Sequence, residues 1–116
     1  MNYEPVVEEA ARAAAKQLVP QYGARVEAEV EAALHSAGEA PQPSQYIDPV
    51  SLGILIVAIA TFIYPIYSDH KKKGEKPAKD ALARKARVEW RRERELTADG
   101  EKIIEIVSAE IIERDQ

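Results

Sequence analysis

Residues 49–68 read Pro-Val-Ser-Leu-Gly-Ile-Leu-Ile-Val-Ala-Ile-Ala-Thr-Phe-Ile-Tyr-Pro-Ile-Tyr-Ser and carry no charge, in a chain of which 31% is Asp, Glu, Lys or Arg. A helix rises about 1.5 Å per residue, so a run of this length covers roughly 30 Å, the thickness of the hydrocarbon core of a bilayer. The run therefore predicts a single transmembrane or membrane-inserted helix, with the lipid bilayer as a partner.

The charges on the two sides of this run differ and predict its orientation. Residues 29–48 contain no Lys or Arg, whereas residues 69–88 contain eight. Positively charged flanks stay on the cytoplasmic side of a membrane. We therefore expect a membrane protein, placed in a bacterial inner membrane, with the C-terminal side of the run in the cytoplasm.

Tyrosines and lysines flank the run and are typical of membrane interfaces. Amphipathic tyrosine rings favour the headgroup level, and lysines attract anionic lipids. Pro65 removes one backbone hydrogen bond, so we expect it to bend the helix or to end it near Tyr64. The expected membrane-anchoring side chains are Tyr46, Tyr64, Tyr67, Lys71, Lys72 and Lys73.

Two helix faces are candidates for contacts with other helices. Small and branched side chains recur on one face of the apolar run, where they allow close approach of a second backbone. A second apolar stripe lies near the C-terminus, between charged residues. The candidate contact residues are Gly53, Val57, Ala60 and Thr61 in the first face, and Ile103, Val107 and Ile111 in the second.

The remaining segments predict further helices, so the expected fold is all-α. Residues 1–38 form two alanine-rich amphipathic stretches, separated by Pro20 and Gly23, that predict a helical hairpin. Residues 39–48 are a polar, proline-containing linker, and residues 69–77 are a basic linker. Residues 78–116 predict a charged helix followed by an amphipathic one, a C-terminal helical pair that starts its second member near Thr97.

Three short stretches carry a family resemblance. They are Asp48-Pro49-Val50-Ser51-Leu52, Ala86-Arg87-Val88-Glu89-Trp90, and Leu96-Thr97-Ala98-Asp99-Gly100-Glu101. Their arrangement resembles the small effector-associated constant components of actinobacterial conflict systems, over roughly the last 65 residues of the chain. The resemblance implies strands at residues 88–90 and 95–97, and it assigns no functional residue.

Nothing in the sequence indicates an enzyme or a cofactor. The chain has no cysteine, two histidines, and no glycine-rich phosphate loop or metal-ligand spacing. Residues 70–95 carry a net charge of +6, but without an aromatic platform for bases, so a nucleic-acid partner is not expected. Because the N-terminal helices bury few large side chains alone, we expect a homo-oligomer or a larger protein complex.

Three functions remain open from the sequence. The first is a single-pass membrane-anchored helical adaptor or assembly subunit of a multiprotein complex, which binds partners through its flanking helices. The second is a small oligomerising effector that disrupts a membrane or forms a pore. The third is a soluble oligomer subunit in which residues 49–68 are buried.

Overall fold

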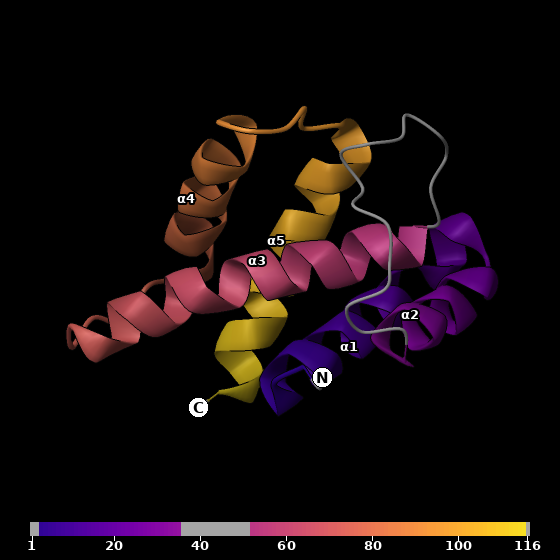
Figure 1. The fold of residues 1–116 in the computed structure, drawn as a ribbon, viewed down its shortest axis with the longest axis horizontal. Coiled ribbons are helices and arrows are strands. Elements are labelled where there is room, and N and C mark those ends of the chain that lie inside the picture. Colours follow the sequence, from indigo (N-terminus) through magenta and orange to yellow (C-terminus); the bar gives the residue numbers. More distant parts are fainter. Residues whose placement is uncertain (1–2, 36–51, 116) are drawn as a thin grey trace.

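Helices account for all the regular structure in the described residues, 3–35 and 52–115 of the computed structural model (Figure 1). The prediction of an all-α fold is confirmed for these residues. Tyr46, the linker at 39–48 and the start of the apolar run lie outside the described residues. The helices of the described part are α1 (Pro5–Tyr22), α2 (Arg25–His35), α3 (Leu52–Lys72), α4 (Lys79–Arg91) and α5 (Ala98–Arg114).

Helices α1 and α2 form the expected N-terminal pair. Pro5 occupies the first turn of α1, where its missing N–H costs no hydrogen bond. Gly23 has φ 94°, a value that side chains with a Cβ rarely adopt, and its N–H donates to the carbonyl of Val19 at 2.8 Å. The chain therefore turns sharply between the two helices.

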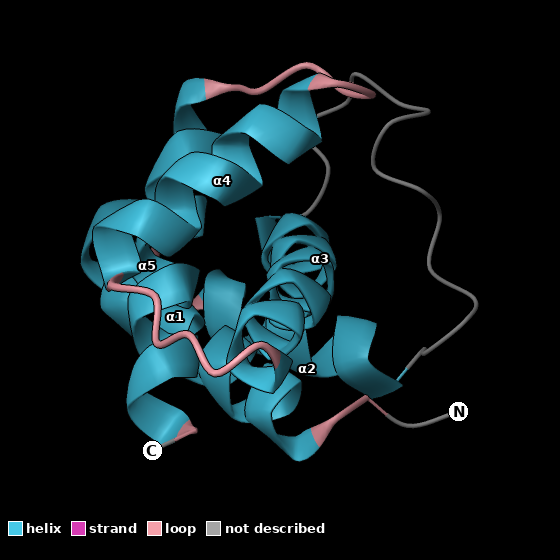
Figure 2. Cartoon of the chain, turned by 90° about the vertical axis from the view of Figure 1, so that its left-hand side faces the viewer, coloured by secondary structure: helices cyan, strands magenta, loops and turns pink. Residues whose placement is uncertain are grey.

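Helix α3 lies at the centre of the other four. It packs against α1, α2 and α5 along much of its length and meets α4 near its C-terminal half (Figures 1 and 2). The side chains of Ile56, Ile59 and Ile63 are fully buried. The sequence led us to expect separate modules on either side of a lone apolar helix, whereas the modules are wrapped around it.

Helix α3 is longer than the proline in it led us to expect. Helical structure continues through Pro65 to Lys72, so the expected end near Tyr64 is wrong. Pro65 itself is exposed, which leaves room for its ring on the outside of the bundle. The first turns of the expected basic linker at 69–77 therefore belong to this helix.

Helices α4 and α5 complete the bundle. The hydroxyl of Thr97 accepts a hydrogen bond from the backbone N–H of Gly100 at 3.0 Å and caps the N-terminus of α5. Trp90 of α4 meets Phe62 of α3 edge to face, with ring centroids 5.2 Å apart. Residues 88–90 lie in α4 and no described residue is in a strand, so the strands implied by the family resemblance are wrong.

A polar side chain is enclosed in this apolar core. Ser108 of α5 is fully buried, and its Oγ has no hydrogen-bond partner among residues 3–35 and 52–115. A buried hydroxyl without a partner costs about 1–3 kcal/mol. The stability of the bundle is therefore reduced at this position.

Replacing this hydroxyl tests the packing of α5. We expect Ser108→Ala to raise the free energy of unfolding by up to about 1 kcal/mol, because it removes the unpaired group. Thr97→Ala removes a paired hydroxyl from the same helix, and we expect it to lower that free energy by about 1 kcal/mol. Urea denaturation followed by circular dichroism measures both. A loss of stability in Ser108→Ala would show that its hydroxyl has a hydrogen-bond partner and would contradict this prediction.

Candidate functional site

Helix α3 has two faces that differ in their surroundings. Its outer face contains half-buried Ile54, Leu55, Ala58, Phe62 and Ile66, with Thr61 and Pro65 exposed. Figure 2, which views α3 nearly along its axis, shows α1 and α5 beside it. The inner face is buried and consists of Gly53, Ile56, Val57, Ile59, Ala60, Ile63 and Tyr67.

The N-terminal end of α3 is held against α2. A Cβ on Gly53 would overlap the backbone carbon of Glu29 and lie 2.5 Å from the backbone nitrogen of Val30, so only glycine allows this approach. The N–H of Gly53 donates to Oε1 of Glu29 at 3.2 Å. A carboxylate at this end of a helix is also favoured by the helix dipole.

The C-terminal end of α3 is held by α5. Nζ of Lys71 lies 2.6 Å from Oδ2 of Asp115, and the hydroxyl of buried Tyr67 donates to the same carboxylate. The ion pair with Lys71, and then the bond from Tyr67, lower the pKa of Asp115 below its ordinary value. Polar contacts to Glu29 and Asp115 thus fix the two ends of one apolar helix.

Several side chains expected to anchor the protein in a membrane have contacts inside the bundle. Tyr67 and Lys71 bind Asp115, and Tyr64 is half-buried. Lys73 forms an exposed ion pair with Asp69 at 3.4 Å. Of the lysines in this cluster, Lys72 is the one left exposed with no ion pair to another described residue.

The expected helix-contact residues also lie mainly inside the bundle. Gly53, Val57 and Ala60 are buried on the inner face of α3. Thr61 is exposed, and its hydroxyl donates to the carbonyl of Val57 at 2.8 Å. The three expected residues on α5 are almost fully buried: Ile103, Val107 and Ile111.

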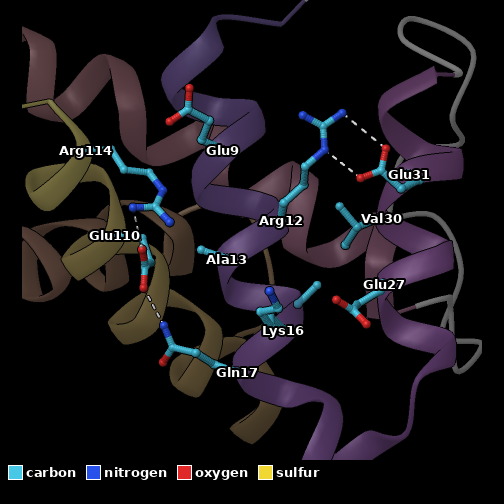
Figure 3. Close-up of a pocket in the computed structure, with 11 residues that line it drawn as sticks. Glu9, Arg12, Ala13, Lys16, Gln17, Glu27, Val30, Glu31, Glu110 and Arg114 are labelled. Atoms are coloured by element: carbon cyan, nitrogen blue, oxygen red, sulfur yellow. Dashed lines mark hydrogen bonds and ion pairs between the residues drawn. The ribbon is translucent and has the colours of Figure 1, made fainter.

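A groove of about 610 Å³ lies on the side of α1 that faces solvent, between α2 and α5 (Figure 3). Nε of Arg12 is 2.6 Å from Oε2 of Glu31 across the groove, and this bond lowers the pKa of Glu31. Arg114 and Glu110 pair on the α5 side at 3.4 Å. Sequence reasoning missed this groove because it requires α5 beside α1 and α2, and α5 is far from them in the chain.

The groove carries both paired and unpaired charges. Arg12 pairs with Glu31 and Arg114 with Glu110, while Glu9, Lys16 and Glu27 form no ion pair with another described residue. Within residues 3–35 and 52–115, no group of three or more His, Asp or Glu side chains could hold a metal ion.

The sequence matches no protein-family model, and no curated protein or solved structure shows significant similarity to it.

The contact between α2 and α3 predicts an effect of enlarging Gly53. We expect Gly53→Ala to lower the free energy of unfolding by roughly 2–3 kcal/mol, because backbone atoms of α2 must move to admit the methyl group. Gly100→Ala is the control, since its Cβ meets the movable end of Leu96 at 3.1 Å. Equal stability of Gly53→Ala and the parent protein, measured in urea, would contradict this contact.

The carboxylates of the Arg12–Glu31 and Lys71–Asp115 pairs predict a loss of stability in acid. A pKa that is lower in the folded state stabilises the fold above the ordinary pKa, and the effect disappears as pH falls through the folded value. The pKa values of Glu31 and Asp115 are lowered, so we expect the urea midpoint to fall below about pH 4. Asp115→Asn should reduce this dependence.

Proposed function

We propose that the protein is a helical adaptor or assembly subunit, without enzymatic activity, that reaches a membrane through α3 and binds partner proteins through the flanking helices. The observation that carries the proposal is α3 itself. It has 21 residues, it is long and apolar enough to cross a membrane, and residues 52–68 carry no charge. Lysines follow directly at its C-terminal end.

A spanning α3 and the five-helix bundle exclude one another. The helices around α3 carry charged side chains on their outer sides, among them Arg12, Glu31, Glu110 and Arg114. Ionised groups in the hydrocarbon core cost several kcal/mol each, so these helices do not accompany α3 into lipid. The proposed membrane form therefore requires α3 to separate from α1, α2 and α5.

Separation of α3 supplies the surfaces for partner binding. The apolar sides of the flanking helices now rest on α3 and on one another, at Val7 and Leu18 of α1, Val30 of α2, and Ile104 and Val107 of α5. Exposed to water, such stripes favour binding to a groove or to other amphipathic helices. Membrane binding and partner binding would then be coupled.

The proposed membrane form has a defined direction. Basic residues follow α3 and are absent from 29–48, so the positive-inside rule favours a cytoplasmic C-terminal side. We propose the inner membrane of a bacterium as its location. In this arrangement α4 and α5 meet cytoplasmic partners.

A second candidate is an adaptor that keeps α3 as its permanent core. The full burial of Ile56, Ile59 and Ile63 and the polar contacts at both ends of α3 favour it. In this case the closed bundle itself binds partners, through polar surfaces such as the groove between α2 and α5.

Cysteine labelling distinguishes the two candidates, because the chain has no cysteine of its own. Ala60→Cys reports on the inner face, where the native residue is fully buried, and Thr61→Cys reports on the outer face. In water, we expect a charged maleimide to label position 61 rapidly and position 60 slowly. With phospholipid vesicles, a spanning helix protects both positions, because water is excluded from the bilayer core.

The two candidates predict different labelling in this experiment. Continued labelling of position 61, with protection of position 60, in the presence of vesicles would overturn the membrane form and support the permanent core. Val88→Cys, on the exposed side of α4 at 47% exposure, is the control and should react in both conditions. Extraction of the vesicles with alkaline carbonate provides a second measurement, since a spanning protein is retained.

A further inference from the structure

Unpaired basic side chains gather where α3 ends and α4 begins. The basic corner consists of Lys72, Lys76 and Lys79, all of them exposed. In Figure 1 the turn between the two helices projects from one end of the molecule. The corner is therefore open to a flat surface from that end of the molecule.

The backbone of this turn is well defined by hydrogen bonds. Gly74 has φ 81°, and its N–H donates to the carbonyl of Lys71 at 3.0 Å. The N–H of Glu75 donates to the carbonyl of His70 at 3.0 Å, and the two side chains meet at 2.5 Å. This closed turn places Lys72 and Lys76 on the surface.

Many cations elsewhere in the described chain are already paired with carboxylates, among them Arg12, Arg25 and Arg114. None of the three side chains of the basic corner forms an ion pair or hydrogen bond with another residue of 3–35 or 52–115. Lys16 in the groove and Lys85 of α4 are further cations without an ion pair in this part of the chain. The corner thus retains its charge for an external anion.

The corner is continuous with the apolar outer face of α3. Thr61, Pro65 and Lys72 follow one another at spacings of four and seven residues, which places them on the same side of the helix. Exposed Asp69, which pairs with Lys73, lies between Pro65 and Lys72 on this side. An apolar strip that ends in charged residues with unpaired lysines among them matches a bilayer surface, with acyl chains beside headgroups. Nucleic acid fits less well, because Trp90 is only 4% exposed and offers no stacking surface.

We propose that the basic corner docks the closed bundle on an anionic lipid surface, before α3 separates from the other helices. This inference rests on the proposed function and adds the lipid class and the side chains that recognise it. Each lysine or arginine near an anionic membrane strengthens binding to it. Removal of three of them therefore lowers the affinity for anionic vesicles by roughly 100-fold. Binding weakens with added salt for the same reason.

Flotation of the full chain with vesicles tests the docking. The vesicles contain either phosphatidylcholine alone or phosphatidylcholine with phosphatidylglycerol. The test variant is Lys72→Gln with Lys76→Gln and Lys79→Gln. The control variant removes the same charge elsewhere, by Lys16→Gln with Arg25→Gln and Lys102→Gln, and circular dichroism checks that both variants keep the helical fold.

We expect the parent protein and the control variant to float with the anionic vesicles only, and the test variant to stay behind. Equal binding to neutral vesicles, or an equal loss in both variants, would overturn the proposal. Failure to bind vesicles, together with retention on RNA or on a second copy of the chain, would overturn it as well.

Docking and the spanning helix can fail independently. If the anionic vesicles bind the parent protein while the thiol introduced by Thr61→Cys stays open to maleimide, docking holds and the spanning form fails. If the test variant binds as well as the parent and that thiol becomes protected, the spanning form holds and docking at the corner fails.

Discussion

Burial of the inner face of α3 is the contact on which the rest of the bundle depends. Ile56, Ile59 and Ile63 lose all exposure there, and each buried side chain of this size contributes about 1.5–3 kcal/mol. Alanines of α1 allow its backbone to come close, as Gly53 does for α2. Among the described helices, α4 touches only α3 and α5. Without α3, α1 would still pack on α2 and α5, and α5 on α4, but the apolar sides that α3 covers would face water.

An uncharged run of residues has two physical explanations, and hydropathy does not distinguish them. Both lipid and a protein interior are dry, so both favour residues 52–68 without charges. The flanking helices carry the additional information. Their narrow apolar stripes, at Leu18, Val30 and Val107 for example, need a complementary surface, and in this bundle α3 provides it. A long apolar helix between amphipathic ones therefore fits a bundle as well as a membrane.

Local chemistry explains which parts of the fold could be predicted. Pro5, Gly23 and Thr97 act on the backbone beside them, so the helix starts and the first turn could be read from sequence. The contacts of Asp115 with α3 and of Arg12 with Glu31 join residues far apart in the chain, and depend on how helices pack. We expected Tyr67 and Lys71 at a membrane surface because their partner, Asp115, is far from them in the chain. A tyrosine hydroxyl or a lysine suits a headgroup layer as well as it suits a contact with a carboxylate.

The free energy of transferring α3 into lipid depends on what then covers the helices around it. Its inner face is already dry, so the transfer gains little there, and only the outer face leaves water. The same transfer uncovers the apolar stripes of α1, α2 and α5, which costs free energy unless another surface covers them. A partner that binds these stripes therefore favours the membrane form, and a membrane that takes up α3 favours partner binding by the same amount. An adaptor built in this way would assemble its complex only where a membrane is present.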